Sequence, residues 1–114
     1  LSQLTVGVAG VSGTGSIIAE QLMRLGVKRL ILVDDDVVEV RNLGRILNST
    51  KADADEQVNK AIMMQKAYSA VGLGTEVIAL PTVILNAMCC LGVWTPLMGE
   101  CISIKSALSI AFLI

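Results

Sequence analysis

A glycine-rich segment between two apolar runs constrains the fold of this chain more than any other feature of the sequence. Residues 4–9 (LTVGVA) form the first run, which is typical of a short buried strand. Residues 10–16 (GVSGTGS) follow, and residues 29–33 (RLILV) form a second strand-like run. A strand, a glycine-rich turn, a helix and a second strand in such a short stretch predict a βαβ unit with parallel strands.

The helix of this unit is predicted from its spacing and its end. Glu20 and Arg24 lie four residues apart with the acid first, which supports a helix, and Gly26 is typical of a helix C-terminus. The apolar residues at helical spacing, which we expect on the buried face, are Ile17, Ile18, Leu22 and Leu25.

The rest of the chain predicts further elements of an α/β protein. A long loop is expected over residues 37–53, with a helical turn near 43–47. A helix over 55–71, with apolar positions at Ala61, Met64, Tyr68 and Val71, is expected to end at Gly72 and Gly74. A strand over 76–80, a short helix over 83–91 and an apolar helix or strand over 104–114 follow. We therefore expect a single domain, residues 1–114, with a Rossmann-like fold: a mainly parallel sheet with flanking helices.

Composition agrees with this class and excludes several functions. Hydrophobic residues make up 54% of the chain but aromatic residues only 3%, so the apolar side chains are aliphatic, as in parallel strands buried on both faces. With 9 basic and 10 acidic residues the net charge is -1, which gives no reason to expect a nucleic acid or an anionic membrane as partner. The chain has no histidine and so lacks the commonest general base and metal ligand.

Two features bear on cellular location. Residues 77–99 carry no charge and are long enough to span a bilayer, but Pro81 and Pro96 interrupt them and no basic flank marks a cytoplasmic side. Without CxxC spacing, the cysteines are expected to be small buried hydrophobes in a reducing cytosol, with a catalytic thiol as the alternative; they are Cys89, Cys90 and Cys101. We expect a cytoplasmic protein without a membrane span.

The glycine-rich segment and the acidic residue after the second strand predict an adenosine site. Glycines between a strand and a helix let the backbone approach a phosphate, and the helix N-terminus favours an anion; the candidate residues are Gly10, Ser12, Gly13 and Gly15. Asp34 follows the second strand, where a carboxylate can accept hydrogen bonds from ribose hydroxyls. Asp35 is expected to be a solvated acidic residue of the turn. These elements serve NAD as well as ATP.

The stretch from Asp34 to Arg45 distinguishes the two nucleotides. It reads Asp-Asp-Asp, a short spacer, then Asn42-Leu43-Gly44-Arg45, and so resembles the ubiquitin-activating-enzyme-like (ThiF/MoeB/HesA) adenylyltransferases over roughly residues 5–80. A dehydrogenase does not need Asn-Leu-x-Arg here, whereas an enzyme that stabilises charge as pyrophosphate leaves does need an arginine.

This resemblance implies roles for several residues. The glycines would line the phosphates, Asp34 would hold the ribose, and Asn42 and Arg45 would contact the triphosphate, with Arg45 as the catalytic residue. Asp36 is also counted among the nucleotide-binding residues. A lysine on the following helix would also bind phosphate. Lys60 is the best match and Lys51 stays open, while an ordinary solvated lysine is the alternative at position 60.

The chain also departs from the family. The family holds Mg²⁺ with an aspartate after its fourth strand, but no aspartate follows Asp55 and only Glu100 remains as a carboxylate in that region, so no metal ligand is predicted. The segment from about Met88 to the end does not resemble the family, and we expect the isolated chain to lack activity.

We therefore expect the ATP-binding part of an adenylyltransferase that activates a carboxylate, typically the C-terminus of a ubiquitin-like or sulfur-carrier protein. A noncatalytic nucleotide-binding or dimerisation module and an NAD-dependent oxidoreductase are the alternatives. The apolar segment 104–114 predicts a homo-oligomer, because a small domain can hardly bury all of it.

Overall fold

The sheet has the strand arrangement that the sequence predicts. The computed structural model of the chain describes residues 2–82 and the backbone of residues 110–113. Within these residues a four-stranded sheet has the order β3-β2-β1-β4, made of β1 (Thr5–Ala9), β2 (Arg29–Val33), β3 (Glu76–Leu80) and β4 (Ile110–Leu113). β1, β2 and β3 are parallel, with Thr5 opposite Arg29 and Arg29 opposite Glu76, and β4 is antiparallel to β1. The prediction of a Rossmann-like, mainly parallel sheet is confirmed.

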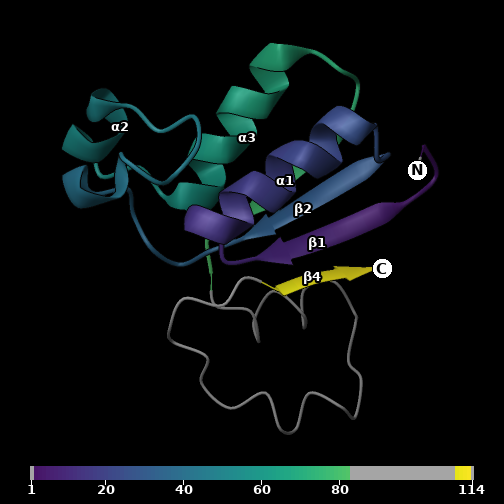
Figure 1. Cartoon of the computed structure of the whole chain (residues 1–114), viewed down its shortest axis with the longest axis horizontal. Coiled ribbons are helices and arrows are strands. Elements are labelled where there is room, and N and C mark those ends of the chain that lie inside the picture. The colour runs from purple at the N-terminus through teal and green to yellow at the C-terminus, as the bar shows by residue number, and fades with distance from the viewer. Residues whose placement is uncertain (1, 83–109, 114) are drawn as a thin grey trace, which may run out of the picture.

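Two helices cover one face of this sheet (Figure 1). α1 (Gly13–Leu25) joins β1 to β2, which confirms the predicted βαβ unit, and α3 (Lys60–Val71) precedes β3. The carboxyl ends of β1 and β2 point towards the side of the molecule that carries α2 (Lys51–Asp55). In open parallel sheets ligands bind outside the carboxyl ends of the strands, so this is the side on which a site is expected.

α1 has the predicted ends but a different buried face. Gly26 has φ +85°, and its N–H donates to the carbonyls of Leu22 and Met23, as expected of a glycine that caps a helix. Ile17 and Leu25 were expected to be buried, which is wrong, because they are 46% and 61% exposed. The buried residues of α1 are Gly15, Ser16, Ala19 and Met23. Three of these four are small, and they let the helix axis lie close to the strands.

The predicted helix over residues 55–71 begins later than expected, at Lys60, and a separate short helix, α2, precedes it in the predicted loop. α2 begins after Thr50, whose hydroxyl accepts the N–H of Asp53, and it ends at Asp55. Gln57 has a positive φ of 51°, which interrupts the helical path, and Asn59 then caps α3. The expected long loop over residues 37–53 likewise contains a 3-10 helix, η1 (Val40–Asn42), just before the predicted helical turn.

The core lies between the helices and the sheet. Its fully buried side chains include Val8, Leu30, Leu32, Met23 and Met64. Ala61, Met64 and Tyr68 of α3 are buried as expected, whereas Val71 is exposed at the end of the helix. The predicted helix over residues 83–91, residues 104–109 and the three cysteines lie outside the described residues, while residues 110–113 form a strand.

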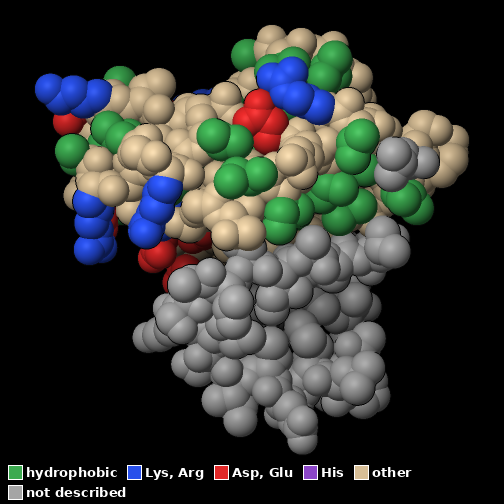
Figure 2. All heavy atoms as spheres, in the orientation of Figure 1, with side chains coloured by type: hydrophobic (Ala, Val, Ile, Leu, Met, Phe, Trp, Pro, Cys, Tyr) green, Lys and Arg blue, Asp and Glu red, His purple; other side chains and the backbone are tan. Residues whose placement is uncertain are grey.

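None of the helices in the described part of the chain has the length and hydrophobicity needed to cross a membrane. In Figure 2, Lys and Arg side chains gather on the side that carries α2 and the loop before it. These basic side chains, with Asp and Glu side chains beside them, lie on the same side as the carboxyl ends of β1 and β2.

Candidate functional site

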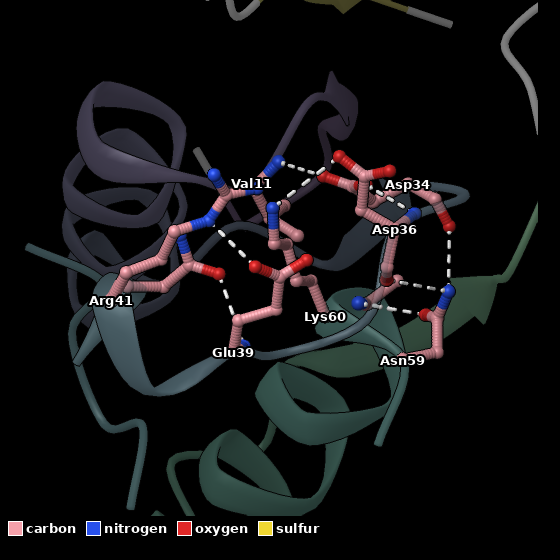
Figure 3. A network of polar contacts seen from close by, with 9 residues as sticks. Val11, Asp34, Asp36, Glu39, Arg41, Asn59 and Lys60 are labelled. Atoms are coloured by element: carbon pink, nitrogen blue, oxygen red, sulfur yellow. Dashed lines mark hydrogen bonds and ion pairs between the residues drawn. The ribbon is translucent and has the colours of Figure 1, made fainter. Parts of the chain in front are cut away.

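The glycine-rich loop is fastened to the end of β2 by two hydrogen bonds. Gly10 follows β1 with φ +84°, a conformation that favours glycine, and its N–H donates to the carbonyl of Val33 at 2.8 Å. The N–H of Val11 donates to Oδ2 of Asp34 at 2.9 Å (Figure 3). The first residues of the loop and the turn after β2 therefore form one unit.

Asp34 is the buried centre of this unit. Its Oδ1 accepts the N–H of Asp36 at 2.9 Å, so each of its carboxylate oxygens holds one backbone group. Burial raises the pKa of Asp34, against the smaller opposing effects of these N–H groups and of Lys60. An ionised carboxylate has about four lone-pair sites, so two hydrogen bonds leave it able to accept more. Asp35 is exposed, as expected of a solvated turn residue.

Lys60, the first residue of α3, contacts the same turn although it lies 24 residues after Asp36 in the sequence. Its Nζ lies 3.4 Å from Oδ2 of Asp36, and its backbone N–H donates to the carbonyl of Asp36 at 3.0 Å. Lys60 is only 6% exposed, so the alternative of an ordinary solvated lysine is wrong. Lys51 lies exposed at the start of α2. The geometry therefore brings Lys60, and not Lys51, into contact with the acidic turn.

Arg45 lies beside the start of α1. A side chain added at Gly13 would meet Cδ of Arg45 at 3.7 Å, so the aliphatic part of this arginine passes over Gly13. Ser16 ties the two segments together, because its hydroxyl donates to the carbonyl of Gly13 at 2.8 Å and accepts the N–H of Leu47 at 3.3 Å. This places an exposed guanidinium-bearing side chain next to the glycine-rich loop.

Asn42 is buried and used within its own segment. Its Oδ1 accepts the N–H of Glu39 at 3.1 Å, and its carbonyl accepts the N–H groups of Arg45 and Ile46. Asn42 thus shapes the loop that carries Arg45.

The first turn of α1 holds the remaining predicted residues. Ser12 occupies the N-cap without a side-chain cap bond, and Gly15 is buried in the first turn. The structure thus joins Gly10, Asp34, Asp36 and Lys60 in one cluster and sets Arg45 beside Gly13.

Sequence reasoning missed two residues that organise the site. Asn59 donates from Nδ2 to the carbonyls of Asp34 and Asp36, and Ser16 links the glycine-rich loop to the Arg45 segment. An asparagine just before a helical run is an N-cap signal and would have placed Asn59. The hydroxyl of Ser16 has no comparable signature, because its partner Leu47 lies far away in the sequence.

One group of acidic side chains in the described part of the chain could offer oxygen ligands to a metal ion. One carboxylate oxygen from each of Asp34, Asp35 and Asp36 lies within 4.8 Å of the others. Asp34 and Asp36 are also engaged within the protein, because both oxygens of Asp34 accept backbone N–H groups and Asp36 pairs with Lys60. Mg²⁺ usually takes one or two carboxylates together with water and phosphate oxygens, and Asp35 is the exposed member of the group that makes none of these contacts.

A sequence model of the ThiF family matches residues 1–96 of this chain. The chain belongs to the ThiF family. Among relatives, the tRNA threonylcarbamoyladenosine dehydratase of Bacillus subtilis (strain 168) is 39% identical over 80 residues, which cover 70% of this chain and 31% of that protein. The ubiquitin-like modifier-activating enzyme 5 of Caenorhabditis elegans is 48% identical over 46 residues, or 40% of this chain and 11% of that protein.

Solved structures agree with this ThiF-family assignment. E. coli TcdA in complex with ATP has a TM-score of 0.65 at 25% identity and matches 75% of this chain and 35% of TcdA. E. coli MccB with ATP shares the fold, with a TM-score of 0.71 at 22% identity over 82% of this chain and 28% of MccB. This ThiF-family chain spans about a third or less of the length of the curated relatives it matches.

Proposed function

We propose that this chain is the nucleotide-binding part of a ThiF-family protein that uses ATP to activate a carboxylate as an acyl-adenylate. One observation carries the proposal. At the carboxyl ends of β1 and β2, the glycine-rich loop is bonded to the buried carboxylate of Asp34, Lys60 pairs with Asp36 in the same turn, and Arg45 lies beside Gly13 of the loop. This arrangement offers acceptors for a ribose and positive charge for phosphates in neighbouring positions.

In this proposal each predicted residue has a distinct task. Asp34 accepts hydrogen bonds from the ribose, and Asp36 orients Lys60 towards the nucleotide. Arg45 and Lys60 neutralise the triphosphate, and the loop lines the phosphates through Gly10, Ser12, Gly13 and Gly15. The contact between Asn42 and the triphosphate stays a prediction, because its side chain holds η1 in the described structure.

The reaction is a transfer of the adenylyl group. A carboxylate oxygen attacks the α-phosphorus of ATP, the bond to the bridging oxygen of pyrophosphate breaks, and the electron pair leaves with pyrophosphate. Positive charge near the leaving group stabilises this step, and Arg45 supplies it. No proton has to move, so the absence of histidine is no obstacle. The carboxylate is proposed to be the C-terminus of a small ubiquitin-like or sulfur-carrier protein.

Titration calorimetry tests the nucleotide site. We expect saturable binding of ATP, weaker binding of NAD, and loss of ATP affinity in Asp34→Ala and Gly13→Val. The Cβ of the valine would lie in ordinary contact with Cδ of Arg45, and its methyl groups would fill space beside the loop where a phosphate is proposed to bind. Absence of ATP binding at millimolar concentration would refute the proposal, and a preference for NAD would point to an oxidoreductase.

Exchange of labelled pyrophosphate into ATP tests the reaction. This chain alone should give no carboxylate-dependent exchange, because no aspartate follows Asp55 and the family's magnesium ligand after its fourth strand therefore has no counterpart in this sequence. Robust exchange by the chain alone would contradict this expectation.

A further inference from the structure

The side chain of Asn59 joins α3 to the acidic turn with four hydrogen bonds. Its Oδ1 accepts the N–H groups of Ala61 at 2.9 Å and Ile62 at 3.2 Å. Its Nδ2 donates to the carbonyls of Asp34 at 2.9 Å and Asp36 at 3.2 Å (Figure 3). The amide oxygen therefore accepts hydrogen bonds from α3, and the amide nitrogen donates hydrogen bonds to the acidic turn.

These bonds fix the two partners of the site relative to each other. The cap sets the residue at which α3 begins, and the next residue is Lys60. A short antiparallel bridge pairs Val37 with Asn59 and holds residues downstream of Asp36. Upstream of that bridge, the carbonyl of Asp34 is held by the Nδ2 of Asn59. The Asn59 amide, this bridge and the bond from the Lys60 N–H to the Asp36 carbonyl thus together hold the acidic turn against the start of α3.

We propose that Asn59 is a positioning residue for nucleotide binding, acting through Asp34 and Lys60. The proposal rests on the proposed function, because it takes these two groups to be ribose and phosphate ligands. Ser, Thr, Asp and Asn all cap helices, but of these only asparagine also carries an N–H₂ donor. Position 59 therefore uses both the oxygen and the N–H₂ group of the asparagine side chain.

Substitution of Asn59 can separate the helix-capping role of its amide oxygen from the hydrogen bonds of its amide nitrogen to the turn. Asn59→Ser and Asn59→Thr keep an oxygen that can cap α3 but lose both hydrogen bonds to the turn. Thr50→Ala is the matched control, because it removes the cap of α2, which makes no contact with the acidic turn among the described hydrogen bonds. Thermal unfolding and ATP titration of this chain measure the two effects independently.

We expect Asn59→Ser to raise the Kd for ATP about tenfold, because the acidic turn and Lys60 are held less firmly relative to each other, and to lower the melting temperature by several degrees, because two intramolecular hydrogen bonds are lost. Thr50→Ala should lower the melting temperature and leave the Kd unchanged. Combining Asn59→Ser with Lys60→Met should raise the Kd by less than the product of the two single effects, because both act through the same ammonium.

Several results would overturn the inference. They are wild-type ATP affinity in Asn59→Ser, independent effects in the double variant, an equal loss of affinity in Thr50→Ala, or failure of both cap-competent variants to fold. If the wild-type chain itself does not bind ATP, the proposed function fails. If the wild type binds and Asp34→Ala does not, a normal Asn59→Ser refutes the positioning role alone.

Discussion

Replacement of Lys60 by methionine should change stability and nucleotide binding in opposite directions. Lys60 is 6% exposed, whereas the side chain of its partner Asp36 is 69% exposed, with 3.4 Å between Nζ and Oδ2. The ammonium has therefore lost most of its hydration, while its counter-charge remains in water, where the attraction is screened. The ion pair compensates only part of the cost of burying the lysine.

The magnitudes follow from this asymmetry. Replacing a buried ion pair by apolar side chains of similar volume is often neutral or stabilising by about 1–4 kcal/mol, whereas removing one partner is destabilising when the other charge stays buried. Asp36 stays solvated, but the buried Asp34 loses a nearby positive charge that lowers its pKa. We therefore expect a net gain of no more than about 1 kcal/mol in the free energy of unfolding and about 4 °C in the melting temperature. In the proposed ATP complex, losing a hydrogen bond to a charged group costs about 1.5–3 kcal/mol, or about 10- to 150-fold in Kd.

Thermal unfolding followed by circular dichroism and calorimetric titration with ATP measure the two quantities. Lys66→Met is the matched control, because Lys66 is an exposed cation of the same helix and should affect neither. Lys51→Met tests the alternative phosphate lysine. The reasoning is refuted if Lys60→Met is destabilised and binds ATP like the wild type, or if Lys51→Met loses the affinity instead.

Two further predictions concern pH and assembly. Since burial raises the pKa of Asp34, its contribution to stability is complete below the ordinary aspartate pKa and is lost as pH rises through the raised value. The free energy of unfolding of the wild type, relative to that of Asp34→Asn, should therefore decrease from about pH 4 upwards, and a pH-independent difference would contradict this. We also expect a dimer or larger oligomer that uses residues 104–114, checked by light scattering at micromolar concentration. A 12.0 kDa monomer, or an oligomer unaffected by Leu108→Glu and Ile110→Glu, would contradict the second prediction.

The parts of the fold that the sequence predicted are those encoded locally. The glycine-rich segment, the two apolar runs and Gly26 all lie within residues 4–33, and their order alone requires a parallel βαβ unit. The rotation of α1 about its axis is not encoded in this way. Ile17 and Leu25 fit a helical apolar pattern, but contact with the sheet selects the small residues instead.

The start of α3 was misplaced for a different reason. The apolar pattern of this helix begins at Ala61 and does not mark its first residue, which the side-chain bonds of Asn59 and the positive φ of Gln57 define instead. In the site, the sequence named Asp36 and Lys60 separately. Their contact spans 24 residues and depends on the path of the chain from β2 to α3, which no local pattern contains.

Asp34 differs from the other site residues because folding and binding make the same demand on it. Its two oxygens accept the N–H groups of Val11 and Asp36, and its unused lone pairs are the proposed acceptors for the ribose. Asparagine has one oxygen, so its amide group would face one of these two N–H donors. The shape of the loop and the ribose site therefore depend on a single carboxylate, and no substitution at position 34 separates them. Lys60 and Asn59 allow that separation, because removing the ammonium or the amide donor leaves the hydrogen bonds of the Asp34 carboxylate in place.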